Sequence, residues 1–167
     1  MVYEGHLFNV ELSELEMSDG VRTLRETIRH PGAVGMIPVA DTGELLFVTQ
    51  YRHAAGRRLL ELPAGTLEPG EEPLAAAIRE LQEEVGFRPG KIEAIGGLYV
   101  APGYTTEYIH LFICTELEAS VLAADEDEDL EVERRTLDEA LAAIESGEIC
   151  DAKSVIGVLR YARQVGG

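Results

Sequence analysis

The strongest constraint on the fold is a helical repeat of apolar residues in residues 71–85. These residues recur every three or four positions along the segment: Leu74, Ile78, Leu81 and Val85. Such spacing places them on one face and predicts an amphipathic helix that packs against a larger apolar surface. Gly86 provides a stop signal after the helix, and residues 63–70, with two prolines and two glycines, predict a loop before it.

The segments on either side of this helix alternate or are continuously apolar, which predicts β-strands. The expected strands are residues 5–16, 21–28, 32–39, 45–50, 92–100, 107–116 and 131–136, and two further helices are expected at 137–146 and 151–165. We expect the first two strands to form an N-terminal β-hairpin, and the next two to form a core hairpin around the turn at 41–43. This order predicts an α+β fold, an α/β/α sandwich around a mixed sheet.

The charge of the chain bears on its partners. The 167 residues fit one compact domain, and 31 acidic against 14 basic residues give a net charge of −17. This balance argues against a nucleic-acid partner, because phosphate backbones bind through clusters of Lys and Arg. The excess acid has two explanations: solubility alone, or a site where a divalent cation mediates the binding of a phosphate compound.

The two cysteines and the first residues bear on the compartment. Cys114 and Cys150 are far apart in sequence, and we expect both to be buried, reduced thiols. The first residues contain neither a basic segment nor an apolar run, and no window of about 18 residues is apolar and uncharged. We therefore expect no signal peptide, no membrane partner and a cytoplasmic location.

Three carboxylates fan across one side of the predicted helix: Glu80, Glu83 and Glu84. Glu80 and Glu84 lie one turn apart, so their like charges repel each other in the absence of a cation. One explanation of the cluster is a solvated acidic face. The other is a site for Mg²⁺, a hard cation that prefers several oxygen ligands held on a rigid element.

A wider pattern over residues 65–87 favours the metal site. Gly65 is followed after five residues by Glu71, and after seven more by the run Arg79-Glu80-Leu81-Gln82-Glu83-Glu84-Val85-Gly86-Phe87. This arrangement resembles the Nudix box at every specified position. The resemblance implies the Nudix fold for residues 31–167, with a loop–helix–loop catalytic motif on a mixed sheet.

The resemblance also implies roles within the box. The residues that would bind Mg²⁺, or Mn²⁺ as a substitute, are Ala64 through its carbonyl, Glu80, Glu83 and Glu84. Glu83 and Glu84 are also expected to be catalytic. Glu71 and Arg79 would form an internal pair in which the arginine orients a neighbouring glutamate. Gly65 would permit a backbone turn that a side chain would block.

Flanking segments resemble the ADP-ribose pyrophosphatases of this family: residues 29–34, 50–52, 60–65 and 101–103. The resemblance implies Mg²⁺-dependent hydrolysis of ADP-ribose to AMP and ribose 5-phosphate. Pro102 and Gly103 match a family marker and are expected at the substrate, and a plain turn explains them equally. Arg52, next to the end of an apolar strand, is the main candidate for holding a phosphate oxygen, with Arg57 and Arg58 as secondary candidates.

Residues 125–131 hold six acids in seven positions and predict a solvated loop. The family resemblance implies that this loop supplies a glutamate that activates water or binds metal once the substrate is present. Glu126 and Glu128 both match that role, and Glu128 is the preferred one.

The resemblance implies a homodimer in which residues 1–30 contribute strands to the partner's site. Two other functions stay open. The chain could hydrolyse another nucleotide, such as GDP-mannose or another sugar nucleotide, a dinucleotide, or a damaged nucleoside triphosphate. It could also be a catalytically silent Nudix domain that senses nucleotides, which predicts missing box carboxylates; none is missing here.

Overall fold

Two sheets form the centre of the protein. The computed structural model describes residues 1–123 and 130–166. The larger sheet has the order β7-β4-β9-β8, with β4 parallel to β9 and the other neighbours antiparallel. Its strands are β4 (Ala33–Pro38), β7 (Ala64–Thr66), β8 (Phe87–Tyr99) and β9 (Tyr108–Ala119). Every residue of β4 is buried, and burial on both faces explains why its sequence is continuously apolar.

The smaller sheet has the order β10-β5-β6 and is antiparallel. Its strands are β5 (Leu45–Arg52), β6 (Arg57–Glu61) and β10 (Glu131–Arg135), with the 3₁₀ helix η1 (His53–Ala55) between β5 and β6. The predicted core hairpin is wrong. Val39, the residue after β4, forms one isolated bridge with Leu45, and β4 and β5 belong to different sheets. Pairing with strands that are distant in sequence, β9 and β10, prevails over the local turn.

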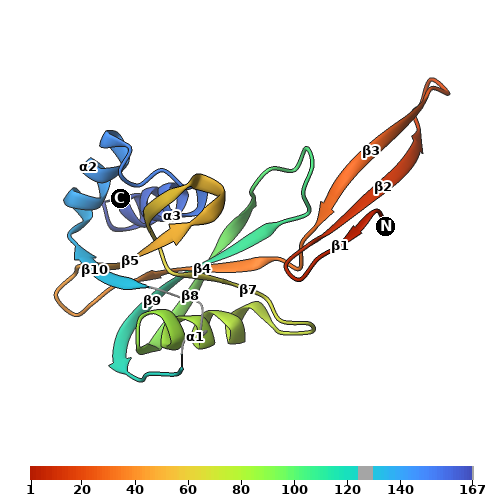
Figure 1. Ribbon diagram of the computed structural model, residues 1–167. Coiled ribbons are helices and arrows are strands. Elements are labelled where there is room, and N and C mark those ends of the chain that lie inside the picture. Colours follow the sequence, from red (N-terminus) through yellow and green to blue (C-terminus); the bar gives the residue numbers. More distant parts are fainter. Residues whose placement is uncertain (124–129, 167) are drawn as a thin grey trace.

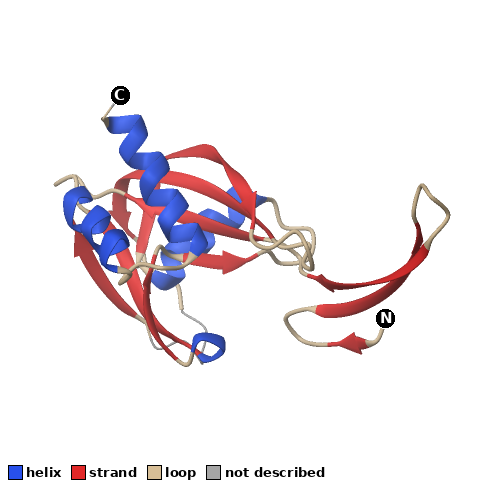
Figure 2. Ribbon diagram, turned by 90° about the horizontal axis from the view of Figure 1, so that it is seen from above, coloured by secondary structure: helices blue, strands red, loops and turns tan. Residues whose placement is uncertain are grey.

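Helices cover both sides of the larger sheet (Figures 1 and 2). They are α1 (Pro73–Glu84), α2 (Leu137–Ser146) and α3 (Ala152–Val165). Successive side chains of β4 point to opposite faces: Met36 joins the apolar cluster that contains α1, and Ile37 joins the one that contains α2 and α3. The predicted α+β sandwich around a mixed sheet is confirmed.

The face through which α1 packs overlaps the predicted apolar stripe only in part. Leu74, placed at the start of the apolar stripe, is 48% exposed. Leu81 and Val85 are buried as predicted. The other buried residues of α1 are Ala76, Ala77, Glu80 and Glu84. The two alanines have no long side chains to hold the helix away from the sheet. This packing turns Glu80 and Glu84 inward, toward strand β7, where they can form a site.

Two short strands occupy segments predicted as loop or left without a prediction. β7 lies within residues 63–70, and β6 covers residues 57–61. By contrast, α2 has the predicted bounds. Thr136 and Glu139 form a reciprocal capping box at its start, and Gly147 ends it in the left-handed conformation.

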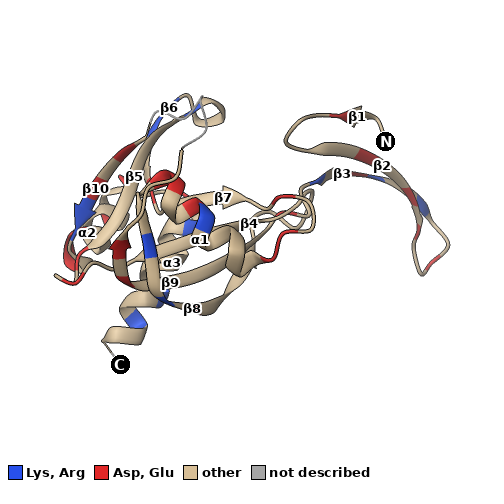
Figure 3. Ribbon diagram, turned by 90° about the horizontal axis from the view of Figure 1, so that it is seen from below, with Lys and Arg blue, Asp and Glu red and all other residues tan. Residues whose placement is uncertain are grey.

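The N-terminal hairpin is present and projects from the body as an arm (Figures 1 and 2). The arm is a sheet of β1 (Tyr3–Glu4), β2 (Asn9–Glu16) and β3 (Arg22–Arg29). Ile28 joins it to the body, donating to the Tyr104 carbonyl at 2.8 Å and accepting from the Thr106 N–H at 3.0 Å. Acidic and basic positions are interspersed along the arm (Figure 3). Several large apolar side chains on it, including Leu12 and Leu24, are exposed.

The two cysteines differ in environment. Cys114 is buried on β9, and burial raises the pKa of its thiol to about 12. Cys150 is exposed, so the prediction that it is buried is wrong; it lies in the turn before α3 and not inside an element. Among the described residues, no helix combines the length and apolar character needed to cross a membrane.

Candidate active site

Strand β7 separates two adjoining cavities. The α1-side cavity, of about 560 Å³, is bordered by Arg79, Glu80 and Glu84. The α3-side cavity, of about 310 Å³, is bordered by Glu61, Glu107 and Lys153. Both share a wall made of Leu7, Arg52, Ala64, Gly65 and Thr66. A ligand with two parts joined by a central linkage would therefore extend across β7 beside Arg52.

Arg79 gathers the acidic residues of the box around one guanidinium. Its Nε and Nη2 each donate to Glu71 at 2.9 Å, and its Nη1 donates to Glu80 and Glu83 at 2.8 Å. Hydrogen bonding to Glu71 is the main cause of a raised Arg79 pKa, and the same bond lowers the pKa of Glu71. Figure 3 shows acidic and basic segments adjoining on α1. The arginine therefore stays charged and holds three glutamates in one place.

Gly65 and Ala64 bring the β7 backbone against two of the helix carboxylates. A Cβ built on Gly65 would lie 1.8 Å from the Glu80 carboxyl carbon. The Ala64 N–H donates to Glu84 at 2.9 Å. Gly65 does not have a positive φ, so it is not needed for the turn we predicted. Glycine is required because the Glu80 carboxylate occupies the space where a side chain would be.

The oxygen atoms at this site are suitable ligands for a hard divalent cation. Glu80, Glu83 and Glu84 offer carboxylate oxygens, and the Ala64–Gly65 backbone passes beside them. Within residues 1–123 and 130–166, no three acidic, histidine or cysteine side chains already converge as a metal site. Glu80 and Glu83 turn toward Arg79 instead, so a cation would compete with that guanidinium for them.

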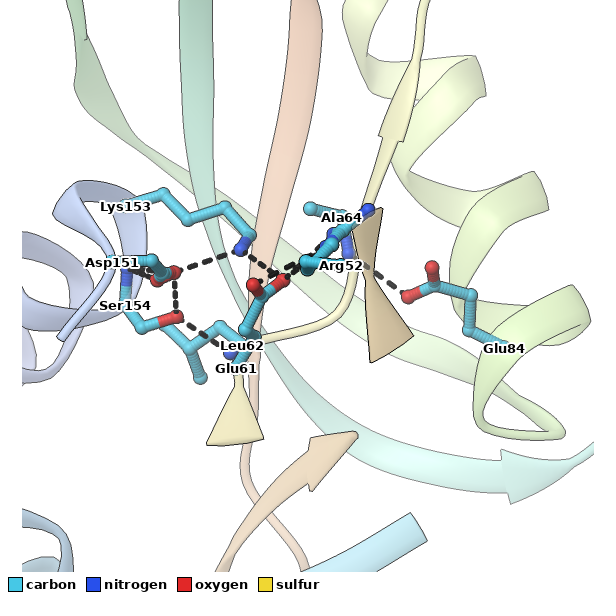
Figure 4. Close-up of polar contacts among 8 residues, drawn as sticks. All are labelled: Arg52, Glu61, Leu62, Ala64, Glu84, Asp151, Lys153 and Ser154. Carbon is cyan, nitrogen blue, oxygen red and sulfur yellow. Dashed lines mark hydrogen bonds and ion pairs between the residues drawn. The ribbon is translucent and has the colours of Figure 1, made fainter. Parts of the chain in front are cut away.

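A second polar cluster lies on the α3 side of β7, around buried Glu61 (Figure 4). Arg52 donates to Glu61 through Nε at 3.1 Å and through Nη2 at 2.7 Å. Lys153 donates to Glu61 and to Asp151, both at 2.8 Å. Burial alone would raise the pKa of Glu61, but the hydrogen bond from Arg52 and the charge of Lys153 together lower it. Glu61 is therefore a buried carboxylate that stays ionised between two cations.

The comparisons with known proteins agree with this geometry. The NUDIX domain model matches residues 29–155. The chain belongs to the Nudix family. It is 39% identical to the ADP-ribose pyrophosphatase of Bacillus subtilis (strain 168) over 161 residues, 94% of this chain and 86% of that one. It is 37% identical to the methanol dehydrogenase activator of Bacillus methanolicus over 159 residues, again 94% of this chain and 86% of that one.

A solved structure shows the same Nudix fold. The crystal structure of an ADP compounds hydrolase superposes with a TM-score of 0.88 at 29% identity, covering 99% of this chain and 90% of that one. The similarity thus includes the N-terminal arm as well as the body, and the match agrees with the α+β Nudix fold expected from the box.

Four other residues predicted for the site, Pro102, Gly103, Arg57 and Arg58, do not border the two cavities. Pro102 and Gly103 lie in the turn between β8 and β9, and the cavity lining there consists of Val100 and Glu107. Arg57 lies 3.1 Å from the Cys150 sulfur, and Arg58 lies 3.1 Å from Glu131. Both therefore contact other residues at the surface of the smaller sheet. Glu126 and Glu128 lie outside the described residues.

Sequence reasoning missed Glu61, Asp151 and Lys153 as site residues. One signal was present: Glu61 is an ionisable residue between Leu60 and Leu62, and such a residue in an apolar run is buried with partners. Lys153 gave no comparable signal. Its partner Glu61 is 92 positions away, and only the fold brings the two together.

Proposed function

We propose that this Nudix enzyme hydrolyses the pyrophosphate bond of ADP-ribose to AMP and ribose 5-phosphate, with Mg²⁺ as its metal and Mn²⁺ as a substitute. The observation that carries the proposal is the wall shared by the two cavities. It places Arg52 beside β7, with carboxylates of α1 on one side and the cavity bordered by Glu61, Glu107 and Lys153 on the other. A nucleoside diphosphate joined to a sugar has the matching form: two ends and a charged centre.

Each residue of the site would have a separate role in the reaction. Glu80, Glu83, Glu84 and the Ala64 carbonyl would hold Mg²⁺. When bound, that ion neutralises phosphate charge and lowers the pKa of a coordinated water. Arg52 would donate to a phosphate oxygen. Arg79 and Glu71 would position the box glutamates. Glu126 or Glu128 would accept the proton of the attacking water, with Glu128 preferred. Pro102 and Gly103 would shape the turn beside the substrate.

ADP-ribose is favoured over other nucleotides because the Bacillus subtilis ADP-ribose pyrophosphatase is 39% identical over 94% of this chain, whereas the GDP-mannose pyrophosphatase of Citrobacter koseri is 35% identical over 86% of it. Besides the Bacillus subtilis protein, the ADP-ribose pyrophosphatase of Mycobacterium tuberculosis is 35% identical over 95% of this chain. The complete box also favours catalysis over silent nucleotide sensing, since Glu80, Glu83 and Glu84 are all present.

A product assay tests the proposal. The purified protein is incubated with Mg²⁺ and ADP-ribose, GDP-mannose or a nucleoside triphosphate, and products are separated by chromatography. We expect AMP and ribose 5-phosphate from ADP-ribose, dependence on the metal, and slower turnover of the other substrates. Faster cleavage of GDP-mannose or of the triphosphate would replace the substrate assignment. Tight binding of ADP-ribose without cleavage would favour the sensing role.

We also propose that residues 1–30 form a dimerisation element and that the protein acts as a homodimer. The register of β2 and β3 puts Val10, Leu12, Leu24 and Ile28 on one face of the arm. Leu12 is 43% and Leu24 59% exposed in the single chain. A second copy that covered this face would remove apolar surface from water.

A further inference from the structure

The strongest unexplained feature is a pair of cations that share one buried carboxylate. Arg52 and Lys153 both donate to Oε2 of Glu61, at 2.7 and 2.8 Å. The side chains of Glu61 and Lys153 are only 3% and 9% exposed, whereas that of Arg52 is 40% exposed. A buried ion pair is a weak source of stability, because desolvation of the charges offsets their attraction. A reason other than stability is therefore needed for this cluster.

The cluster fixes three elements relative to one another. Arg52 ends β5, Glu61 ends β6, and Lys153 lies in the first turn of α3. Asp151 caps that helix by accepting from the Ser154 N–H, and the Ser154 hydroxyl accepts from the Leu62 N–H at 2.7 Å. The hydrogen bond from Leu62 to Ser154 thus ties the backbone between β6 and β7 to the start of α3. Figure 4 shows this connection, with Lys153 and Arg52 on either side of Glu61.

The geometry of Arg52 suggests that the cluster orients its guanidinium. Glu61 takes Nε and Nη2, which form one edge of the planar guanidinium. The remaining Nη1 edge points away from Glu61, because the group is flat and rigid. Arg52 also borders both cavities. In addition, the negative charge of Glu84 acts on Arg52 and helps to raise its pKa. Arg52 therefore lies between two carboxylates, and its bonds go to Glu61.

We propose that Glu61 and Lys153 are positioning residues for Arg52. Glu61 holds the guanidinium away from Glu84 and directs its free edge toward the pyrophosphate, and Lys153 holds Glu61 from the α3 side. Without the charge on Glu61, Arg52 is free to pair with Glu84, which removes both the phosphate donor and a carboxylate of the proposed metal site. This inference rests on the proposed function for the identity of the ligand, and not for the placement of Arg52.

The first test does not depend on activity. The side-chain Nε–H resonance of Arg52 is identified in ¹⁵N spectra of the full protein by its loss in Arg52→Lys. We expect slow solvent exchange of this proton in the wild type and at least about tenfold faster exchange in Glu61→Gln, because the charge-assisted bond is weakened. Glu145→Gln, the same change at an exposed position, is the control. Unchanged exchange in Glu61→Gln would overturn the positioning role whatever the substrate is.

The second test is a double-mutant cycle on the KM for ADP-ribose and on the Mg²⁺ concentration that gives half-maximal rate. Glu61→Gln is expected to raise both by about tenfold, with a smaller change in kcat. In an Arg52→Ala background, Glu61→Gln should have little further effect, since its target is gone. Effects that multiply independently would overturn the inference. If the wild type cleaves another nucleotide, the cycle is measured with that nucleotide. If it cleaves none, the proposed function fails, and the exchange measurement alone decides the placement of Arg52.

Lys153 is tested by its own pair of variants. Lys153→Met should accelerate exchange of the Arg52 Nε–H and raise KM, and Lys153→Arg should restore both toward wild type because it keeps the charge beside Glu61. Thermal unfolding by circular dichroism shows whether each variant is folded. If Lys153→Met unfolds, the double variant Glu61→Gln/Lys153→Met, which removes both charges, is compared with Glu61→Gln. Equal exchange rates and KM in these two variants are expected if Lys153 acts through Glu61, and further changes in the double variant would overturn that role. Identical KM and exchange rates in Lys153→Met and wild type would remove Lys153 from the proposal.

Discussion

A single guanidinium, that of Arg79, offsets charge repulsion on the acidic face of α1. Glu80 and Glu84 lie one turn apart, and Glu83 adjoins them; like charges at this spacing destabilise a helix. Arg79 offsets the repulsion by contacting Glu80 and Glu83 together with Glu71. Its side chain is 24% exposed, so water screens these contacts only in part. These ion pairs therefore lower the electrostatic cost of placing three carboxylates on one side of the helix.

Replacing Glu84 tests the metal site at the level of one residue. We expect Glu84→Gln to reduce kcat for ADP-ribose by about 10³-fold, because a charged group that stabilises the transition state is lost. The amide oxygen of Gln can still accept from the Ala64 N–H, so the fold should persist. Turnover at saturating Mg²⁺ and thermal unfolding are measured together. Near-normal turnover in Glu84→Gln would rule out this residue as a metal ligand.

Gly65 offers a second residue-level test. In Gly65→Ala the new methyl group meets the Glu80 carboxylate, so either the carboxylate or β7 must move. Displacement of about 1 Å at a catalytic site can reduce the rate about 100-fold, and we expect a loss of that order. Gly103→Ala, where a Cβ meets no atom within 4 Å, serves as the control for stability and should leave the melting temperature nearly unchanged. An unaltered rate in Gly65→Ala would show that the close contact has no role.

At the scale of elements, the N-terminus of α2 is stabilised by a capping box. Thr136 accepts from the Glu139 N–H, and the Glu139 side chain accepts from the Thr136 N–H at 2.8 Å. We expect Thr136→Ala to reduce the free energy of unfolding by about 1 kcal/mol, the usual contribution of such a cap. Urea unfolding at neutral pH measures the change. A difference below the error of the method would show that the tertiary contacts of α2 hold it without the cap.

The same cap predicts a pH dependence. Hydrogen bonds from the Thr136 backbone and hydroxyl lower the pKa of Glu139 from its ordinary value of 4.5. A carboxylate with a lowered folded-state pKa contributes stability above its unfolded pKa, and that stability is lost as the pH falls through the folded value. Unfolding free energies in the wild type should therefore decrease more steeply below pH 4.5 than in Glu139→Gln. Parallel curves would show that Glu139 does not contribute.

How much of the fold the sequence predicts depends on whether a signal is local. The bounds of α2 follow from Thr136, Glu139 and Gly147, all within or next to the helix. The pairing of β4 with β9 and of β5 with β10 joins segments that are far apart, and the local turn at 41–43 indicates a hairpin that does not form. Strands β6 and β7 were not predicted because they are short. In addition, Pro63 precedes β7, and Pro69 and Gly70 follow it, a composition that predicts a loop.

The candidate site divides in the same way. The box from Gly65 to Phe87 is continuous, so its resemblance to the Nudix box identifies the carboxylates as candidates. The prediction that Leu74 packs inward was wrong because periodicity does not reveal which neighbouring face the sheet will cover. The cluster of Glu61, Asp151 and Lys153 depends on α3 lying beside β6, and no repeat in the sequence encodes that contact.

At the scale of the whole molecule, the proposed role of the arm is to join two copies of the chain. We expect the wild type to sediment with twice the 18.2 kDa mass of the chain. The double variant Leu12→Asp/Leu24→Asp should sediment as a monomer, because it puts charge on the apolar face. Leu15→Asp, an exposed leucine on the opposite face of the hairpin, is the control and should stay dimeric. A wild type that sediments as a single chain would dismiss the dimer.

Because one thiol is exposed and the other is buried, the protein can be labelled with a fluorescent dye at one cysteine without any substitution. Near neutral pH a maleimide dye should attach to exposed Cys150 and leave buried Cys114 protonated and unreacted. Mass spectrometry would show one dye per chain; two would contradict the burial of Cys114. The dye would sit one residue from Asp151, at the entrance to α3. Its emission could then report nucleotide arrival in real time, and energy transfer between differently labelled copies could report their association.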